Sequence, residues 1–273
     1  MKSVWGYLIA LLLLASAVVG FADKNAVQED MVKTTVLIFN QTGGGMSIEG
    51  WLGSGVIVSE DGYIVTNRHV VGYYLQPNGT DKQGKDLYVI KGADPHLVVY
   101  HEDWGYGGCR IVAVSDDPLR DLAVIKIEPS EPLKFATVAS VENMFAGDVV
   151  YARGHPLGVG WVLTRGTITK FLKTEDQNRF LLHDASINPG NSGGPLYDEF
   201  GHVVGLNYAA IPPFFAENMA VAIDARVVAR FIELAIRFDQ MRMEVLSETS
   251  FEETKRTYYY DGTHYHYGGQ GGP

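Results

Sequence analysis

Gly190-Asn191-Ser192-Gly193-Gly194-Pro195 sets one serine among three glycines. A serine hydroxyl is a weak nucleophile, so acyl transfer through it requires an imidazole that takes its proton and a carboxylate that orients the imidazole. Gly193 and Gly194 allow another strand to approach closely behind the serine. The hexapeptide therefore predicts a nucleophile loop in which Ser192 attacks a carbonyl carbon.

The backbone of the same loop indicates where negative charge is stabilised. A tetrahedral intermediate carries its charge on the former carbonyl oxygen, and backbone N–H groups must point at that oxygen. Gly190 allows the chain to turn its N–H towards the same pocket as the N–H of Ser192, because it has no side chain to hinder the turn. We expect these two N–H groups to form the oxyanion hole, with Asn191 contributing to it.

A histidine and an aspartate upstream complete the catalytic set. Thr66-Asn67-Arg68-His69 closes one β-branched segment, and Asp121-Leu122-Ala123-Val124 opens another. The order His, Asp, Ser along the chain is that of chymotrypsin-like enzymes and differs from the order in subtilisins and α/β-hydrolases. We predict His69 as the general base and then the general acid, with Asp121 as the residue that orients it. Asp117 is the strongest alternative to Asp121.

The segments around these residues resemble the motifs of HtrA-type (high-temperature-requirement) serine proteases, in the same order. They are residues 53–71, 117–127, 154–158 and 184–195. The resemblance implies a serine endopeptidase that cleaves unfolded or misfolded polypeptides, needs no cofactor or metal, and assembles as a homotrimer. Two features depart from the family. The chain ends too soon for the PDZ domain that usually follows, and the separation of His69 from Asp121 is longer than usual, which we assign to an enlarged loop between Tyr73 and Gly108.

The pattern of strands predicts an all-β fold, a chymotrypsin-like double six-stranded β-barrel with a C-terminal helix, in a protease domain over residues 30–246. Short β-branched stretches bounded by turn residues are typical of strands. The first barrel is expected to use residues 32–39, 51–52 with 55–58, 63–66, 87–90, 97–99, 110–114 and 122–127. The second is expected to use residues 148–152, 162–169, 180–182, 195–197, 203–208 and 219–223. Apolar residues at three- and four-residue spacing over 224–246 predict an amphipathic helix packed on the second barrel.

The two ends of the chain have their own signatures. Residues 1–22 carry a lysine at position 2, continue through an uncharged apolar stretch and end in Gly20-Phe21-Ala22, the pattern of a cleavable signal peptide. Ala15-Ser16-Ala17 is a second cleavage candidate. Residues 4–22 are also close to the roughly 20 residues that cross a bilayer, so an uncleaved membrane anchor is the alternative. We expect an exported protein, periplasmic or extracellular, with a disordered low-complexity tail over residues 247–273.

The net charge and the cysteine content argue against some binding partners and against some kinds of chemistry. The formal net charge is -10 and no basic run occurs, which argues against nucleic acid as a partner. Cys109 is the single cysteine, so no intramolecular disulfide can form. No motif of a catalytic thiol surrounds it, and we interpret it as a buried small hydrophobic residue.

The resemblance also implies where the substrate lies. Ser186 and Ile187 occupy positions that line the first substrate pocket in relatives. Neither is acidic, so we expect cleavage after small or medium aliphatic residues and not after Lys or Arg. Asn207 and Tyr208 resemble the strand that pairs with the substrate backbone, a mode of recognition that tolerates many sequences.

We assign no catalytic or metal-binding role to three other histidines. His155, in a Gly-His-Pro turn, is interpreted as structural, and His264 with His266 lacks the further ligands of a metal site. Asn191 stands where zymogen-type relatives have an aspartate that pairs with a newly cut amino terminus. The resemblance therefore implies an oxyanion hole set by loop conformation.

Two other functions stay open at this level. The first is a protease-fold chaperone or binding module whose activity is latent because its oxyanion hole is unformed. The second is a membrane-anchored regulatory protease that acts on one partner and keeps residues 4–22.

Overall fold

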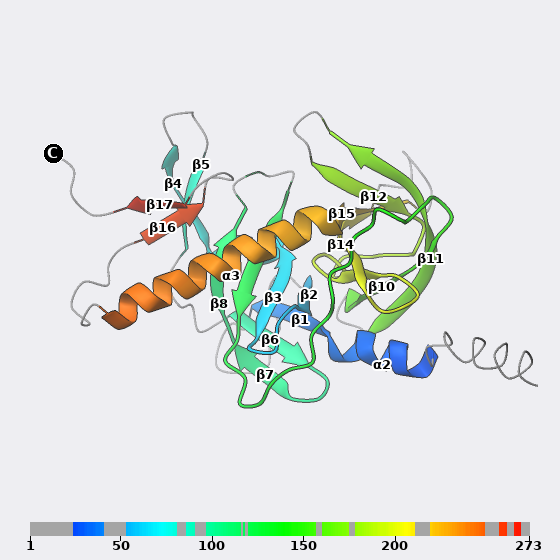
Figure 1. Ribbon diagram of the computed structural model, residues 1–273, viewed down its shortest axis with the longest axis horizontal. Coiled ribbons are helices and arrows are strands. Elements are labelled where there is room, and N and C mark those ends of the chain that lie inside the picture. The colour runs from blue at the N-terminus through cyan, green and yellow to red at the C-terminus, as the bar shows by residue number, and fades with distance from the viewer. Residues whose placement is uncertain are drawn as a thin grey trace, which may run out of the picture.

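The computed structural model describes residues 24–40, 53–80, 86–90, 97–115, 117, 120–156, 160–174, 178–210, 219–248, 257–260 and 265–268. The predicted export segment lies outside these residues, as does most of the predicted tail. The described part contains an N-terminal sheet, a C-terminal barrel and two α-helices that pack on them (Figure 1).

The N-terminal half is a seven-stranded antiparallel sheet. Its strands are β1 (Thr35–Asn40), β2 (Gly53–Ile57), β3 (Tyr63–Asn67), β6 (Leu97–His101), β7 (Gly105–Gly108), β8 (Arg110–Val114) and β9 (Leu122–Lys126), paired in the order β7-β6-β1-β2-β3-β9-β8. Ile64 packs into a core formed by this half alone, whereas its neighbours Tyr63 and Val65 pack against the C-terminal half. Successive side chains of a strand point to opposite faces, so this sheet is covered on both.

The C-terminal half is a closed six-stranded barrel. Its strands are β10 (Val149–Gly154), β11 (Val162–Lys173), β12 (Arg179–His183), β13 (Pro195–Tyr197), β14 (Val203–Ala210) and β15 (Ala220–Asp224). They close in the order β10-β11-β12-β15-β14-β13, with β13 pairing back to β10. Val150, Leu181, Leu196 and Val204 belong to the core of this barrel.

The expected architecture, mostly β with a C-terminal helix, is confirmed, and each strand expected in the second barrel is present. The first half differs in detail, because its outer strands β7 and β8 are not paired with each other within the described residues. Leu87–Ile90 does not join this sheet. It lies in β5 (Asp86–Ile90), which pairs with β4 (Leu75–Thr80) in a separate hairpin, and β6 is the strand that pairs with the edge of β1. The loop expected before Gly108 thus contains four strands, including the glycine-rich β7 that the sequence pattern does not predict.

The first residues of the domain also differ from their prediction. Residues 32–33, predicted to open the first strand, close helix α2 (Lys24–Lys33). The hydroxyl of Thr35 donates to the carbonyl of Met31 at 2.8 Å, which satisfies one carbonyl of the last helical turn. The buried hydroxyl of Tyr197 lies 3.1 Å from the same threonine. These tertiary and capping contacts outweigh the β-preference of the Val-Lys-Thr-Thr-Val stretch.

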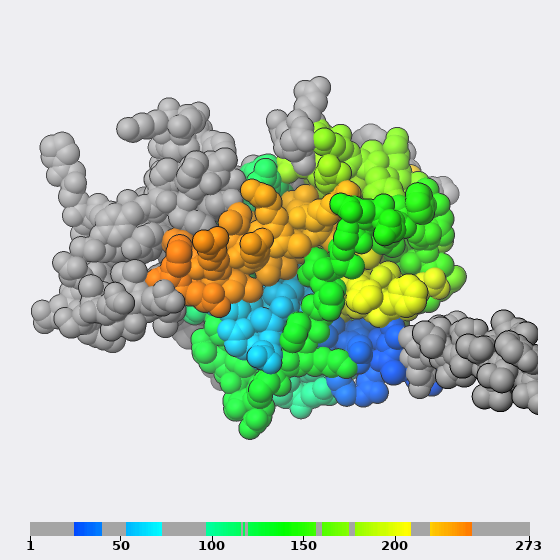
Figure 2. Space-filling model, viewed as in Figure 1, coloured from blue at the N-terminus to red at the C-terminus, as the bar shows by residue number. Residues whose placement is uncertain are grey.

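Helix α3 (Ala225–Glu248) joins the two halves. Its amphipathic character is confirmed, since Val228, Phe231 and Ala235 are buried in the core between the halves. The helix contacts β14 and β15 of the barrel and also β3, β8 and β9 of the sheet, so it is not packed on the second barrel alone. Figure 1 shows it crossing the front of the molecule, and Figure 2 shows its outer face exposed along that path.

An ionic cluster holds the later turns of α3 on the sheet. The carboxylate of Asp239, which is 2% exposed, accepts hydrogen bonds from both terminal nitrogens of Arg110 at 2.8 and 2.6 Å. The hydroxyl of Tyr63 donates to the same carboxylate at 2.8 Å. Burial raises the pKa of Tyr63, and the neighbouring carboxylate raises it further, so this hydroxyl stays a donor. The buried charge of the helix is thereby paired and hydrogen-bonded.

The C-terminal segment contains a short hairpin. β16 (Thr257–Tyr260) and β17 (Tyr265–Gly268) pair as antiparallel strands, which differs from the expected disorder at these positions. Consecutive tyrosines favour a strand, and the compositional argument did not weigh that preference. Within the described part of the chain, no helix combines the length and apolarity needed to cross a membrane.

A histidine lies in the interior of the barrel. His183, at the end of β12, is 0% exposed, and alternation along the strand places it on the same side as Leu181 of the barrel core. Neither ring nitrogen has a hydrogen-bond partner within the described residues. Burial lowers the pKa of His183 to about 4, so the folded protein keeps this ring neutral.

This burial predicts a loss of stability in acid. An unfolded histidine binds a proton near pH 6.5, whereas folded His183 binds one only near pH 4. The unfolded state therefore binds more protons between these values, and the free energy of unfolding falls by about 3 kcal/mol as the pH drops from 6.5 to 4. Urea titrations at several pH values should show this component in the wild type and not in His183→Gln. Equal pH slopes for the two proteins would contradict the assignment.

Candidate active site

The nucleophile loop between β12 and β13 is held by its own backbone. The N–H of Asn191 donates to the carbonyl of Asn188 at 2.9 Å, and the N–H of Gly194 donates to the carbonyl of Asn191 at 2.9 Å. Gly190 has a φ of 104° and Gly193 a φ of 79°, both in the left-handed region that glycine adopts without strain. The loop therefore depends on glycine at these two positions.

The predicted close approach behind the serine is confirmed at Gly193. A Cβ at this position would lie 2.9 Å from the backbone nitrogen of Asn67, and closer still to the carbonyl oxygen of Ser54 and to Oγ1 of Thr66. The N–H of Ser54 donates to the carbonyl of Ser192 at 2.8 Å. A loop of the barrel is thus packed directly on β2 and β3 of the sheet.

His69 and Asp121 are in direct contact. Nδ1 of His69 lies 2.6 Å from Oδ2 of Asp121, and the backbone N–H of His69 donates to Oδ1 at 2.9 Å. The aspartate side chain is 8% exposed and the histidine side chain 43% exposed. An ionised carboxylate can only accept, so it keeps the proton of the neutral ring on Nδ1 and leaves Nε2 as the acceptor.

The backbone of Asp121 has an unusual conformation at its contact with His69. Among the described residues, Asp121 is the one non-glycine residue with a positive φ, 38°, a region that aspartate tolerates better than most residues. Its carbonyl accepts from the N–H of Arg68 at 2.9 Å and from Nδ2 of Asn67 at 3.0 Å. The 3₁₀-helix η1 (Arg68–Tyr74), which carries His69, is thereby tied to the start of β9.

Asp117, the alternative orienting residue, has other partners. Its carboxylate accepts from Nδ2 of Asn178 at 3.0 Å and lies 3.5 Å from Nε of Arg120. The imidazole of His69 has the carboxylate of Asp121 as its partner. The geometry therefore favours Asp121 over Asp117.

Tyr208 links the serine and histidine sides of the site. The hydroxyl of Ser192 donates to the carbonyl of Tyr208 at 3.3 Å, and the Tyr208 ring lies edge-on to the His69 ring with centroids 6.4 Å apart. Ser192 comes from the barrel and His69 from the sheet, so the site lies between the halves. In this arrangement the serine hydroxyl donates to Tyr208, so it has to leave that carbonyl before it can donate to the imidazole.

Two of the N–H groups near the serine are unused. Within the described residues, the N–H groups of Gly190 and Ser192 have no hydrogen-bond acceptor, whereas the N–H of Asn191 is bound to Asn188. The Asn191 side chain is 2% exposed, and its Oδ1 has no partner in the described part of the chain. Asn191 therefore shapes the loop, and the free donors are those of Gly190 and Ser192.

The residues predicted to contact substrate have different surroundings. Ser186 is exposed and its carbonyl accepts from Oγ1 of Thr164 at 2.8 Å, whereas Ile187 is partly buried against the barrel core. Asn207 is fully buried. Its backbone N–H and carbonyl are bound to Gly194 and Gly193, so they are not available to a substrate strand. Tyr208 remains at the site, and the pocket itself stays a prediction.

Other reactive side chains lie away from this chemistry. The ring of His155 packs edge-on to Trp161 with centroids 5.3 Å apart, which agrees with a structural role. Burial raises the pKa of the Cys109 thiol to about 12, which disfavours a thiolate nucleophile. Among the described residues, no group of three His, Cys, Asp or Glu side chains could hold a metal ion.

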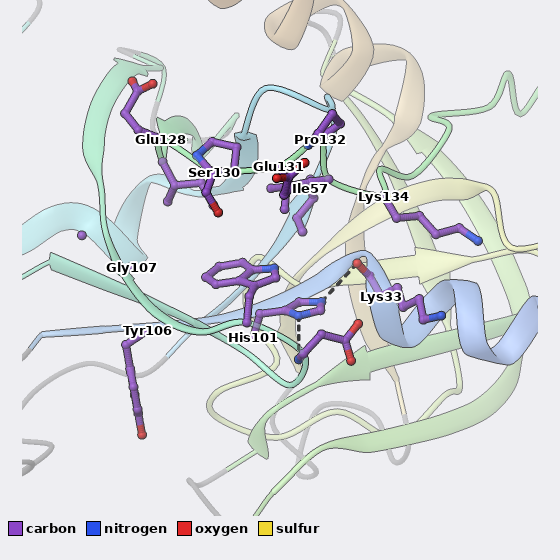
Figure 3. Close-up of a pocket in the computed structure, with 16 residues that line it drawn as sticks. Lys33, Ile57, His101, Tyr106, Gly107, Glu128, Ser130, Glu131, Pro132 and Lys134 are labelled. Atoms are coloured by element: carbon purple, nitrogen blue, oxygen red, sulfur yellow. Dashed lines mark hydrogen bonds between the residues drawn. The ribbon is translucent and has the colours of Figure 1, made fainter.

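A hollow of about 610 Å³ lies elsewhere, between the end of α2, the β6–β7 turn and residues 127–134. Figure 3 shows His101 within it, hydrogen-bonded to the carbonyl of Lys33 and to the N–H of Asp103. Both ring nitrogens of this histidine are therefore satisfied. The lining contains none of the predicted catalytic residues, so we do not assign the chemistry to this hollow.

Sequence reasoning missed the contribution of Ser54. Its backbone N–H binds the carbonyl of Ser192, and its hydroxyl donates to the carbonyl of Gly190 at 2.8 Å. The available signal was the position of this polar residue between Gly53 and Gly55 in a buried strand. A polar side chain buried there needs partners, but its partners lie on a loop far along the sequence.

Comparisons with known proteins place the chain in a family. The model of the trypsin-like peptidase domain matches residues 53–206, which is more than half of the chain. The chain belongs to this family, and its half-open sheet, closed barrel and C-terminal helix are those of its HtrA-type members. The described residues contain no PDZ domain.

Relatives and solved structures agree with this membership. The chain is 39% identical over 163 residues to a probable periplasmic DegP-like serine endoprotease of Chlamydia trachomatis, covering 58% of this chain and 28% of that protein. It is 32% identical over 208 residues to the magnetosome formation protease MamE of Paramagnetospirillum magneticum, covering 74% of this chain and 24% of that protein. The chain thus spans about a quarter of the length of these relatives.

Among solved structures, the crystal structure of the serine endoprotease from Yersinia pestis superimposes with a TM-score of 0.60 at 29% identity, covering 79% of this chain and 67% of that one. The HtrA-type protease AlgW with a tripeptide gives a TM-score of 0.61 at 26% identity, covering 77% of this chain and 62% of that one. Both likenesses extend over most of the described fold.

The contact between His69 and Asp121 predicts a spectroscopic signature. A proton on Nδ1 in a short, charge-assisted bond to a carboxylate is strongly deshielded, so its resonance lies far downfield of other ring N–H signals. Proton NMR should show this signal in the wild type and in Asp117→Asn, and lose it in Asp121→Asn. The opposite pattern would make Asp117 the partner of His69.

Proposed function

We propose that this chain is an exported serine endopeptidase of the HtrA type, in which Ser192, His69 and Asp121 form the catalytic triad. The observation that carries the proposal is the 2.6 Å contact between His69 and Asp121 in a trypsin-like peptidase domain, with Ser192 and His69 both in contact with Tyr208. A carboxylate, an imidazole and a serine in this relation are the requirement for serine acyl transfer.

The first half-reaction forms an acyl-enzyme. Ser192 Oγ attacks the substrate carbonyl carbon while His69 Nε2 takes its proton, and Asp121 stabilises the resulting imidazolium. The N–H groups of Gly190 and Ser192, which are free of acceptors within the described residues, bind the oxyanion. His69 then gives the proton to the leaving amine, the C–N bond breaks, and the acyl group stays on Ser192.

The second half-reaction regenerates the enzyme. A water molecule gives a proton to His69 Nε2 and attacks the ester carbon, and the same N–H groups hold the second oxyanion. His69 returns the proton to Ser192 Oγ as the acyl–oxygen bond breaks. The chain's own side chains perform every proton transfer, and the products are a carboxylic acid and an amine.

The substrate is an unfolded or misfolded polypeptide bound in an extended conformation beside Tyr208. An extended peptide is recognised mainly through its backbone, which tolerates many sequences. The non-acidic Ser186 and Ile187 favour small or medium aliphatic residues before the cut. The DegP-like relative is named as periplasmic, which supports export by residues 1–22.

Two alternatives predict different behaviour. A protease-fold binding module would bind unfolded chains without turnover, whereas the unused N–H groups of Gly190 and Ser192 favour a site that can hold an oxyanion. A membrane-anchored regulatory protease would retain residues 4–22 and cleave one partner. Homotrimer formation is part of the proposal by family resemblance and is measured separately by the mass of the mature protein in solution.

Digestion of casein by the wild type and by Ser192→Ala tests the proposal. Loss of the hydroxyl should lower the rate by on the order of 10⁵-fold to 10⁶-fold, leaving only the contributions of binding and the oxyanion hole. Thermal melting of both proteins controls for folding. Retention of more than about a tenth of the activity in folded Ser192→Ala would rule out Ser192 as the nucleophile.

A further inference from the structure

We propose that Ser54, on β2 of the N-terminal sheet, is the positioning residue that sets the oxyanion hole of the barrel's nucleophile loop. Ser54 does not touch the reacting atoms. It holds the carbonyls of Gly190 and Ser192, which lie on either side of the N–H of Ser192 along the chain, and the first of them belongs to the residue that carries the other free donor. This inference rests on the proposed function of the site and adds a residue to which the catalytic argument gives no role.

The direction of each hydrogen bond of Ser54 follows from its partners. The hydroxyl lies 2.8 Å from the carbonyl oxygen of Gly190 and 3.2 Å from the backbone nitrogen of His155. A carbonyl can only accept and a backbone N–H can only donate, so the hydroxyl donates to Gly190 and accepts from His155. The N–H of Ser54 donates to the carbonyl of Ser192 at 2.8 Å. One residue thus contacts the loop at two points.

These two contacts fix the orientation of peptide planes. A peptide unit is planar, so holding its carbonyl also sets the direction of its N–H. The unit between Gly190 and Asn191 is held at its oxygen by Ser54 and at its N–H by Asn188. The unit after Ser192 is held at its oxygen by Ser54 and at its N–H by Asn207.

The unit between these two carries the N–H of Ser192, and its carbonyl accepts from the N–H of Gly194. Three successive peptide units are therefore oriented, and Ser54 holds the first and the third. Gly190 needs this restraint most, because glycine rotates freely where other residues are limited by their side chains. Rotation of the peptide unit between Gly190 and Asn191 would change the loop and with it the orientation of the N–H groups of Gly190 and Ser192.

Close packing on all sides restricts the side chain of Ser54. The residue is 0% exposed. A Cβ on Gly194 would lie 3.0 Å from Cβ of Ser54, and a Cβ on Gly154 would lie 2.9 Å from its Oγ. Glycines on two segments of the barrel therefore allow β2 to bring this hydroxyl to the loop. Because the contact crosses between the halves, the oxyanion hole is complete only when sheet and barrel are docked.

Ser54→Ala removes the hydroxyl and keeps the backbone contact to Ser192. The carbonyl of Gly190 and the N–H of His155 then lose their partners, which leaves the first peptide unit held at one end only. A misdirected oxyanion donor affects the transition state and not the bound substrate. We expect kcat on a peptide substrate to fall roughly 10-fold to 100-fold and KM to stay within about threefold of the wild type.

Thr35→Val is the matched control. It also deletes a buried hydroxyl, which contacts the carbonyl of Met31 and the hydroxyl of Tyr197, but its contacts lie away from the nucleophile loop. We expect this variant to melt at a lower temperature with unchanged kcat. Ser54→Cys is the second variant at the site, because it keeps nearly the same volume while its thiol is a weak donor, and its kcat should fall between those of Ser54→Ala and the wild type.

A binding measurement separates positioning from general damage. A peptidyl boronic acid forms a tetrahedral adduct on Ser192, whereas the parent peptide binds Ser192→Ala without reaction. Affinity for the boronic acid should fall in Ser54→Ala by about the same factor as kcat. Affinity of the peptide should be equal for Ser192→Ala and the double variant Ser54→Ala/Ser192→Ala.

The outcomes distinguish this inference from the proposed function. An inactive, folded wild type would overturn the proposed function itself. With an active wild type, the inference is overturned if folded Ser54→Ala and Ser54→Cys keep kcat within about threefold. It is equally overturned if peptide affinity falls as much as boronic acid affinity, if Thr35→Val loses kcat to the same extent, or if neither Ser54 variant folds.

Discussion

The docking of the nucleophile loop on strand β2 is the contact on which the rest of the site depends. The proposed catalytic groups are divided between the halves, with His69 and Asp121 on the sheet and Ser192 on the barrel. A 2.8 Å hydrogen bond from the N–H of Ser54 to the carbonyl of Ser192 joins them, and the absence of a side chain at Gly193 makes the approach sterically feasible. A core shared by both halves supports this contact. It contains Val56, Tyr63 and Val65 of the sheet, Tyr197 and Leu206 of the barrel, and Val228 and Phe231 of α3.

Within the proposed triad, the Asp121 side chain is far more buried than that of His69, which suits the chemistry we propose. The carboxylate of Asp121 is almost fully buried and receives hydrogen bonds from both the ring and the backbone of His69. The imidazole is partly exposed, which leaves the ring accessible to a substrate. A fixed carboxylate behind a reachable base stabilises the imidazolium that forms during reaction, because the interaction requires no reorganisation at that moment.

Much of this arrangement is predictable from sequence. Ser192, His69 and Asp121 stand in local motifs whose residue types follow from chemistry, and the strands of the barrel are short β-branched runs between turns. Residues 32–33 could not be assigned correctly, because burial of Met31 and a bond from Thr35 decide their helical state. The same holds for β5, whose partner strand no local pattern reveals. The availability of backbone groups at Asn191 and Asn207 depends on hydrogen bonds that only the folded loop defines.

Labelling with a fluorophosphonate, followed by mass spectrometry of the digested protein, tests the central claim most directly. The reagent reacts rapidly with a serine whose proton a neighbouring base can take and which lies beside formed oxyanion donors. Assembly of the two halves into one site predicts a single adduct on Ser192, which His69→Ala should abolish while the protein stays folded. A folded wild type that remains unlabelled, or one labelled at another residue, would contradict the account.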